Sequence, residues 1–371
     1  MRVLHRSADD GYRCPTTSKQ DRRRLTGAGQ SWIRSDCATA DHNRGLPAEA
    51  TRTDYGLRHR GRVHSITRIA ENRRLTRGWG IKPAPFDYHA PTTVEEAVDV
   101  LADLGDDAKV LAGGQSLIPM LALRLTRFDH LVDIGRIPAL RTVEHGDDSV
   151  TLGSMVRQHE IEDSAEIARR IPLLHAATPL IGHFQIRSRG TVGGSIAHAD
   201  PAAEYPAVAL ALDAELEIIG PDGRRVVPAA EFFHGMWSTS VSDGEVLSSV
   251  RFTEWGAGSG FAVEEVARRH GDFAIAGAAC GVQVVGGSIS RATIALFGMD
   301  QVPRRATAAE AALIGARADE ADLLAAGQLA VEGLEPSDDL HASGALRLRI
   351  GATVVRRALT TALARATEQS A

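Results

Sequence analysis

The chain has 371 residues, of which 43% are hydrophobic and 24% are charged, a balance typical of a folded protein of two or three domains. This composition excludes disordered and fibrous classes, and we expect no transmembrane segment because even the apolar residues 207–219 carry three acidic side chains. The net charge of −5 hides an asymmetry: residues 1–80 hold 17 Lys or Arg against 8 Asp or Glu, and the rest holds 25 against 39.

The first 80 residues form an Arg-rich segment without a sustained apolar period of 2 or 3.6 residues. Such a segment cannot bury enough apolar surface to fold, so we expect a disordered extension, which an upstream gene start would also produce. A nucleic-acid arm and a targeting peptide are the alternatives. No aromatic interleaving or amphipathic helix accompanies the arginines, which favours the extension and argues against a nucleic-acid partner.

Order is expected to begin near residue 82, and the first predicted element is a helix over residues 94–104. Thr92 and Glu95 have the spacing of a capping box before it, and Gly105 is a helix stop. Residues 109–112 predict a short buried strand, and residues 117–125 a helix. The pair Gly113–Gly114 therefore lies in a strand-to-helix turn whose N–H groups lead into a helix N-terminus.

The middle of the chain predicts further alternation of strands and helices. Residues 131–134 and 150–153 read as strands, and residues 157–183 as helical, with core positions at Ile161, Ile167, Ile171, Leu174 and Ala177. A second glycine pair, Gly193–Gly194, follows. Residues 207–212 predict a buried helix, residues 214–219 and 224–227 a hairpin, and residues 245–252 another strand.

A glycine-rich stretch at residues 255–260 predicts a domain boundary. Beyond it, residues 277–285 and 288–297 flank Gly286–Gly287 as a hairpin, and residues 306–314, 319–331 and 345–367 predict helices. We therefore expect an extension over 1–80, one domain over 81–255 and a second over 260–367.

The two glycine pairs at 113–114 and 193–194 are the best clue to function. Each removes two consecutive side chains, which permits left-handed backbone angles and lets N–H groups approach an anion such as a pyrophosphate. Either pair alone is more often an ordinary turn. Neither fits the nicotinamide fingerprint Gly-x-Gly-x-x-Gly or the phosphate loop of NTPases, so those two classes are disfavoured.

The three cysteines, Cys14, Cys37 and Cys280, are scattered and odd in number. They offer neither a disulfide framework nor the clustered thiolates of an iron–sulfur or zinc site. A reducing, cytoplasmic location is the expectation, and we predict no metal site in this chain.

The motif Ala112-Gly-Gly-Gln-Ser116, together with Thr191-Val-Gly-Gly-Ser195 and its continuation Ile-Ala-His-Ala-Asp-Pro201, resembles the FAD-binding medium subunits of the molybdenum hydroxylase (xanthine dehydrogenase) family. Carbon monoxide dehydrogenase medium chains are the nearest type. The resemblance covers about residues 81–367. It implies an α+β fold: a two-lobed FAD-binding domain of the PCMH (vanillyl-alcohol-oxidase-like) type, followed by a small antiparallel sheet with helices.

The resemblance also implies roles for individual residues around FAD. The pyrophosphate would be held through backbone N–H groups and hydroxyls of two segments, made of Ala112, Gly113, Gly114, Gln115 and Ser116 and of Thr191, Val192, Gly193, Gly194 and Ser195. Ile181 and Gly182 would lie along the cofactor, Glu204 would hydrogen-bond the adenosine, Leu247 would contact the flavin, and Asp272 and Phe273 would lie at its exposed edge. Glu264 stands where some relatives carry a lysine near the flavin.

Five residues have a competing interpretation. Phe273 is equally compatible with a place in the core of the second domain. His198 and Asp200 suggest a catalytic dyad, but without a nucleophile motif they are better interpreted as loop-shaping residues. Trp237, with the neighbouring His234, is interpreted as a packing residue, because aromatic clusters are usually core.

The predicted function is that of an electron-transfer subunit, since no residue pattern supports substrate oxidation by this chain alone. In the family, electrons pass from a large molybdopterin-binding subunit through [2Fe–2S] clusters on a small subunit to FAD, and then to a quinone, cytochrome, oxygen or NAD. A dimer of such heterotrimers is expected, and peripheral membrane association is left open. The alternatives are a self-sufficient FAD-dependent oxidase or reductase and a scaffold subunit that has lost the cofactor.

Overall fold

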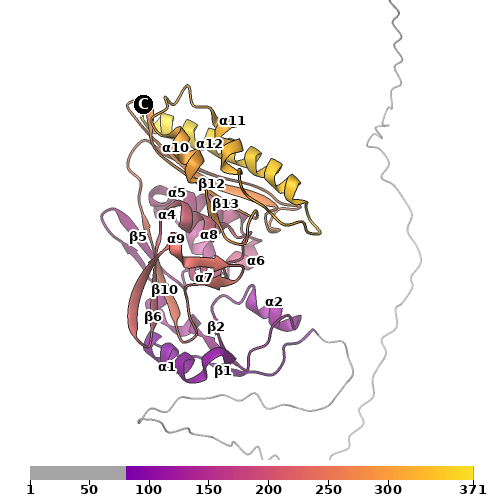
Figure 1. Cartoon of the computed structure of the whole chain (residues 1–371). Helices are drawn as coiled ribbons and strands as arrows, with labels where there is room; N and C mark the ends of the chain where they lie inside the picture. The colour runs from indigo at the N-terminus through magenta and orange to yellow at the C-terminus, as the bar shows by residue number, and fades with distance from the viewer. Residues whose placement is uncertain (1–80, 371) are drawn as a thin grey trace, which may run out of the picture. The chain divides into compact units, whose positions relative to one another are not determined.

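The computed structural model describes residues 81–370, the coloured part of Figure 1. The expectation of a disordered extension over residues 1–80 lies outside the described residues, as do Cys14 and Cys37. The described part is α+β, as predicted, and contains a parallel sheet, two larger antiparallel sheets and a two-stranded ribbon.

A small parallel sheet begins the described chain, with its strands in the order β1-β3-β2. Thr93, not Thr92, caps the first helix: its Oγ1 accepts from the N–H of Glu96 at 3.1 Å, and Glu96 accepts from the N–H of Thr92 at 2.9 Å. The N-cap is thus one residue later than predicted, while the stop at Gly105 is confirmed, with φ of 58°. The elements are β1 (Asp87–His89), α1 (Val94–Leu104), β2 (Ala108–Leu111), α2 (Leu117–Ala122) and β3 (His130–Asp133).

A five-stranded antiparallel sheet forms the second part, in the order β4-β5-β10-β6-β7. The predicted hairpin is present, with β6 paired to β7 through Gly220 and Gly223. The strands are β4 (Val143–His145), β5 (Ser149–Gly153), β6 (Glu215–Gly220), β7 (Gly223–Pro228) and β10 (Val246–Thr253). The ribbon of β8 (Phe233–Gly235) and β9 (Ser238–Thr239) lies between β7 and β10 in sequence.

The helical stretch predicted over residues 157–183 is broken into several short helices. Ser164 starts a new helix by accepting from the N–H of Ile167 at 3.2 Å, and Pro172 keeps Ile171 out of the helical conformation. All five predicted core residues of this stretch are nevertheless buried. The helices are α3 (Gln158–Asp163), α4 (Ala165–Arg170), α5 (Pro172–Ala177), α6 (Phe184–Arg187), α7 (Val192–His198), α8 (Glu204–Ala211) and α9 (Ala229–Phe232).

A second antiparallel sheet, in the order β11-β12-β13-β14, has helices on both faces. Helix α12 lies along one face, and α5 and α8 contact the other (Figure 1). The predicted hairpin is confirmed, because both Gly286 and Gly287 have positive φ between β12 and β13. The bounds are β11 (Ser259–Val266), β12 (Ala276–Val285), β13 (Ser288–Phe297), β14 (Arg304–Arg305), α10 (Thr307–Leu313), α11 (Leu323–Ala330) and α12 (Gly344–Ser370).

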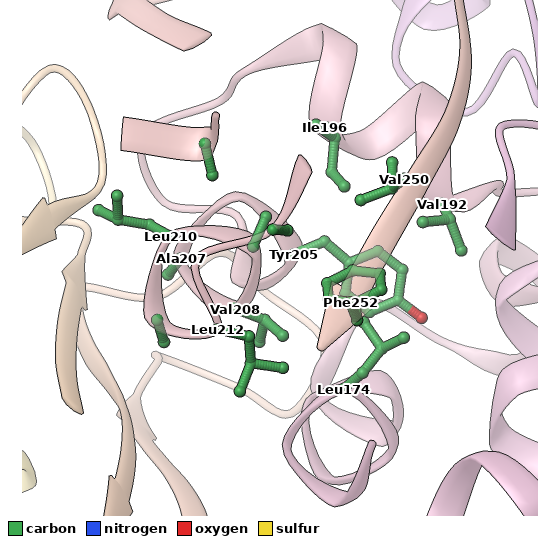
Figure 2. Close-up of a cluster of buried hydrophobic side chains, with 14 of the residues drawn as sticks. Leu174, Val192, Ile196, Tyr205, Ala207, Val208, Leu210, Leu212, Val250 and Phe252 are labelled. Atoms are coloured by element: carbon green, nitrogen blue, oxygen red, sulfur yellow. The ribbon is translucent and has the colours of Figure 1, made fainter. Parts of the chain in front are cut away.

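Helix α8 is the centre of the largest core, and every residue from Glu204 to Ala211 is buried (Figure 2). Tyr205 and Phe252 of β10 both belong to this cluster (Figure 2), which also takes in Phe261 and Phe297 from the second antiparallel sheet. Each such side chain contributes roughly 1.5–3 kcal/mol when it leaves water. The core therefore joins the helices that follow β5 to the sheet of β11, β12, β13 and β14.

Among the residues that the structure describes, no helix is both long enough and apolar enough to cross a membrane.

Replacement of Gly260 by alanine tests the contact between β11 and α12. A Cβ at Gly260 would lie 2.5 Å from the backbone nitrogen of Ala366 and would overlap the carbonyl of Ala362. Because backbone atoms cannot rotate away, we expect Gly260→Ala to lower the free energy of unfolding by about 3 kcal/mol in urea denaturation.

Gly256→Ala is the matched control, because its Cβ would meet only the flexible end of Gln283, at 3.3 Å. Equal stability of the two variants would contradict the described packing of α12.

Candidate cofactor-binding site

The first glycine loop, residues 112–116, connects β2 to α2 as predicted. Gly114 has φ of 73°, a left-handed angle that favours glycine. Within residues 81–370, the N–H groups of Gly113, Gly114, Gln115 and Ser116 donate no hydrogen bond, and the Ser116 hydroxyl makes no cap to α2. The loop therefore presents four unused backbone donors and a hydroxyl at the start of a helix.

The second glycine segment, residues 191–195, is not a turn as predicted but the start of helix α7. Thr191 is the N-cap, and its Oγ1 accepts from the N–H of Gly194 at 3.0 Å. The N–H groups of Val192, Gly193 and Ser195 also donate within the protein, to Val156, Ser154 and Thr191. This segment thus has little to offer through its backbone donors, whereas the Ser195 hydroxyl has no partner within the described residues.

The predicted left-handed angles are wrong for three of the four glycines, since only Gly114 has positive φ. The other three are required by close packing. A Cβ at Gly113 would lie 2.9 Å from the Cα of Gly190 and would overlap the Arg189 carbonyl, and a Cβ at Gly193 would lie 2.6 Å from the Cα of Ser154. The absent side chains let backbone segments approach each other.

The two glycine elements come together, although they are far apart in sequence. A Cβ placed on Gly194 would be 3.3 Å from the Cβ of Ala112. The unused donors of the first loop therefore lie next to the Thr191 and Ser195 hydroxyls of the second segment. An elongated anion with two phosphate groups fits a site of this kind, because it accepts from amide and hydroxyl donors on both sides.

Arginines gather beside this junction. Arg157 bridges to Thr191 and donates through Nη1 to the carbonyl of Arg189, the same carbonyl that faces Gly113. Burial lowers the pKa of Arg157, and the charges of Arg141 and Arg189 lower it further. This concentration of positive charge favours an anion. This cluster of arginines was not predicted from the sequence, because three arginines on separate segments have no diagnostic spacing.

The residues predicted around the flavin also meet. Gly182 has φ of 52°, and a Cβ at Gly271 would lie 2.6 Å from the Gly182 carbonyl oxygen and 2.7 Å from Cε1 of His183. The turn at Ile181–Gly182 therefore packs against the loop that carries Asp272 and Phe273.

Phe273 is 61% exposed, so the interpretation of it as a core aromatic is wrong. Asp272 has one buried carboxylate oxygen that accepts no hydrogen bond and lies 3.5 Å from Arg268. Leu247 is 5% exposed and belongs to the core around α8.

Two carboxyl groups with raised pKa values lie near the start of α8. Burial, followed by the charge of Glu265, raises the pKa of Glu204 to about 8. Burial alone raises the pKa of Glu265 to about 7, and its Oε2 atom is buried without a hydrogen-bond partner. At neutral pH Glu204 is therefore protonated and able to donate a hydrogen bond as well as accept one.

The loop-shaping interpretation of Asp200 is confirmed, because its Oδ1 accepts from the N–H of Ala202 at 2.9 Å. His198 is not in a loop but is the last residue of α7, and its ring stacks on Trp237 with centroids 6.2 Å apart. The interpretation of Trp237 and His234 as packing residues is wrong: Trp237 is 55% exposed and has φ of 58°, and His234 is exposed too. No cluster of three or more potential metal-binding side chains occurs among the described residues.

Two known families match the chain. Residues 84–255 match the FAD-binding domain in molybdopterin dehydrogenase, and residues 261–362 match the C-terminal domain of the CO dehydrogenase flavoprotein. Among curated proteins, the alpha subunit of the 6-hydroxypseudooxynicotine dehydrogenase complex of Paenarthrobacter nicotinovorans is 42% identical over 77% of this chain and 97% of its own length.

Solved structures are similar over the same region. Carbon monoxide dehydrogenase from Hydrogenophaga pseudoflava matches with a TM-score of 0.75 and 42% identity, over 76% of this chain and 99% of the other. Quinoline 2-oxidoreductase from Pseudomonas putida 86 matches with a TM-score of 0.73 and 36% identity, over 77% of this chain and 99% of the other.

The raised pKa of Glu204 predicts a pH-dependent stability. In the unfolded chain a glutamate loses its proton near pH 4.3, whereas folded Glu204 keeps it to about pH 8. The stabilising effect of protonation is thus complete at acid pH and is lost as the pH rises to 8. Glu204→Gln removes this dependence, so in urea denaturation without added FAD it should gain stability relative to wild type between about pH 5.5 and pH 8, by more than about 1 kcal/mol.

Glu144→Gln, at an exposed position on β4, is the control and should show no such gain. A constant difference between Glu204→Gln and wild type across this pH range would argue against a protonated Glu204.

Proposed function

This chain belongs to the FAD-binding medium-subunit family of the molybdenum hydroxylases, and on that premise we propose that it is the electron-transfer subunit of such a complex, holding one FAD between its two glycine elements. The observation that supports this most is the junction of the first glycine loop with the start of α7, where unused N–H donors lie close to the segment that carries the Thr191 and Ser195 hydroxyls. The proposed division into a FAD-binding domain over 81–255 and a second domain over 260–367 follows the same premise.

Each proposed FAD contact has a distinct physical basis. Gly113, Gly114, Gln115 and Ser116 would donate their N–H groups to the pyrophosphate, and the hydroxyls of Ser116, Thr191 and Ser195 would complete its shell. Ala112 and the glycines Gly193 and Gly194 would keep the two sides close, with Val192 buried beneath them. Protonated Glu204 would hydrogen-bond the adenosine.

From the pyrophosphate, on the side away from the adenosine, the flavin would extend along Ile181, Gly182 and Leu247. Asp272 and the exposed Phe273 would flank its outer edge, where a bulky aromatic side chain screens the ring from solvent and moves aside for an electron acceptor. Bound FAD supplies the redox chemistry, since it accepts electrons singly and releases them singly or in pairs. The chain's own residues bind and orient it.

The proposed partners are the subunits that would bind the other cofactors of the complex. Molybdopterin would be bound by a large subunit and [2Fe–2S] clusters by a small subunit, in a dimer of heterotrimers in the cytoplasm. Electrons would arrive from the clusters and leave to an external acceptor. The similar proteins are named for substrates as different as 6-hydroxypseudooxynicotine, carbon monoxide and quinoline, so the medium subunit does not select the substrate in this proposal.

Serine-to-alanine substitutions test the proposed pyrophosphate site. A hydrogen bond to a charged oxygen is worth about 1.5–3 kcal/mol, so Ser116→Ala and Ser195→Ala should each weaken FAD binding by about 10-fold or more. The measurement is titration of the full chain with FAD, followed by flavin fluorescence. Both hydroxyls have no protein partner among the described residues, so folding should be little affected.

Ser290→Ala is the matched control, because that hydroxyl bonds to Gln283 on the second antiparallel sheet. Unchanged FAD affinity in both site variants would contradict the proposed position of the pyrophosphate. A wild-type chain that binds no FAD would favour the scaffold alternative.

The proposal also predicts that the FAD-loaded chain does not oxidise organic substrates by itself. Anaerobic mixing with aldehydes, alcohols or purines should leave the visible absorbance of the oxidised flavin unchanged. Dithionite should bleach it, which is the positive control. Bleaching by one of the organic compounds would favour the self-sufficient oxidase or reductase.

A further inference from the structure

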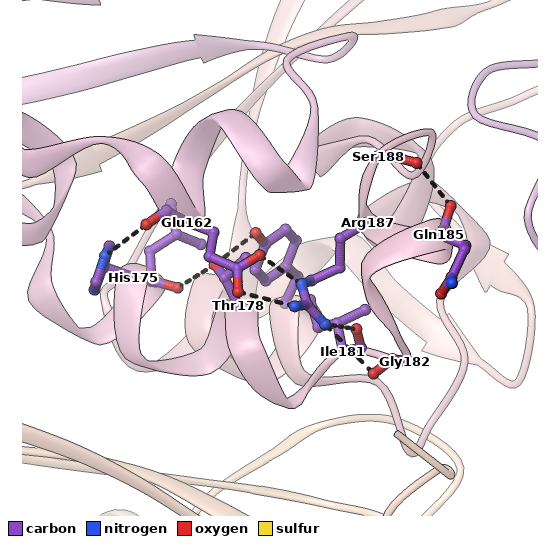
Figure 3. A network of polar contacts seen from close by, with 10 residues as sticks. Glu162, His175, Thr178, Ile181, Gly182, Gln185, Arg187 and Ser188 are labelled. Atoms are coloured by element: carbon purple, nitrogen blue, oxygen red, sulfur yellow. Dashed lines mark hydrogen bonds and ion pairs between the residues drawn. The ribbon is translucent and has the colours of Figure 1, made fainter. Parts of the chain in front are cut away.

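A buried ion pair lies directly behind the turn at Ile181–Gly182. Arg187, at the end of α6, binds Glu162 of α3 through two parallel hydrogen bonds of 2.6 and 2.8 Å (Figure 3). The Arg187 side chain is 10% exposed and that of Glu162 is 27% exposed. This two-bond geometry fixes the plane of the guanidinium group.

The remaining nitrogen of the same guanidinium group holds the turn. Nη1 of Arg187 donates to the carbonyl of Ile181 at 3.1 Å and to that of Gly182 at 3.4 Å (Figure 3). Gly182 has a left-handed φ of 52°, so this turn has a backbone conformation that favours glycine. The ion pair therefore determines where two consecutive carbonyl groups point.

The Ile181–Gly182 turn also supports the loop that carries Gly271. The Gly182 carbonyl faces Gly271, and the rings of His183 and His270 are 6.2 Å apart. Gly271 is followed directly by Asp272 and Phe273. One guanidinium group is thus connected through a single turn to both of the segments that are proposed to flank the flavin.

Further hydrogen bonds join the helices around the ion pair. The Glu162 carbonyl lies 3.0 Å from Nε2 of His175, and Thr178 bonds to the Leu174 carbonyl and to the hydroxyl of buried Tyr205, both at 2.8 Å (Figure 3). The backbone that carries Glu162 is therefore anchored to α5. Replacement of one member of a buried pair leaves the other without compensation.

We infer that Arg187 is a positioning residue for the flavin: with Glu162 it fixes the Ile181–Gly182 turn and, through that turn, the Gly271–Phe273 edge, and so sets the redox potential of the bound FAD. This inference rests on the proposed function. Arg187 has no proposed contact with FAD and acts through the Ile181–Gly182 turn, whose carbonyl groups it holds.

The experiment compares Arg187→Met with wild type in the full, FAD-loaded chain. The readouts are FAD content, the visible circular dichroism of the flavin and its midpoint potential by dye-coupled reduction. We expect FAD to remain bound while its environment changes. A tenfold change in the ratio of affinities for oxidised and reduced FAD shifts a two-electron potential by about 30 mV, and we expect a shift of at least this size.

Arg170→Met is the matched control, because Arg170 is equally buried, pairs with Glu254 and donates to the carbonyls of Gly146 and Ser149 away from the proposed flavin. It should lower stability to a similar degree without moving the potential. Arg187→Lys keeps the charge but loses the two-bond geometry. Its flavin circular dichroism and midpoint potential should lie between those of Arg187→Met and wild type.

An unchanged potential and flavin spectrum in FAD-loaded Arg187→Met would overturn the inference and leave the proposed function intact. If Arg187→Met does not fold, Arg187→Lys and Glu162→Gln decide the question in the same way. A potential shifted equally by Arg170→Met would show a general effect of destabilisation and would overturn it too. A wild-type chain without FAD would overturn both proposals.

Discussion

The contact between the first glycine loop and the start of α7 is the constraint on which the rest of the site depends. The two segments approach closely there: a methyl group at Gly113 would overlap the Arg189 carbonyl just before α7, and one at Gly194 would lie 3.3 Å from the Cβ of Ala112. The N–H groups at the start of α7 already donate to Thr191 and to the carbonyls of Ser154 and Val156. In the proposed site the first loop therefore contributes N–H donors and the α7 side contributes hydroxyls.

Electrostatics reinforces this division. Arg141, Arg157 and Arg189 place positive charge beside the proposed pyrophosphate position, and a bound anion would relieve part of their mutual repulsion. At the other end of the site, Glu204 and Glu265 have raised pKa values because burial disfavours their charged forms. At the proposed flavin end, the charge of Arg187 is neutralised by Glu162, and its guanidinium group donates to the Ile181 and Gly182 carbonyls. Positive charge thus lies at the proposed pyrophosphate, with protonated carboxyl groups toward the proposed adenosine and a neutralised pair toward the proposed flavin.

Local chemistry explains which parts of the fold were predictable. The β12–β13 hairpin follows from Gly286–Gly287 between two alternating strands, and α1 follows from its apolar spacing and Gly105. Strand β11 was not predicted, because Ser259–Val266 starts in a glycine-rich stretch and has two consecutive glutamates just before its last residue. The second glycine pair looked like a turn, yet Thr191 caps a helix across it. The motifs identified the glycine elements, but their junction and the Arg187 network depend on residues brought together only by folding.

The central claim is that this chain recognises the pyrophosphate of FAD and not merely a flavin ring. The most direct measurement compares the affinities of the full chain for FAD and for riboflavin, which has the same ring but no phosphate or adenosine. We predict that the chain binds one FAD, at least about 100-fold more tightly than riboflavin, a difference of about 2.7 kcal/mol. Equal affinities for the two compounds, or no binding of FAD, would contradict it.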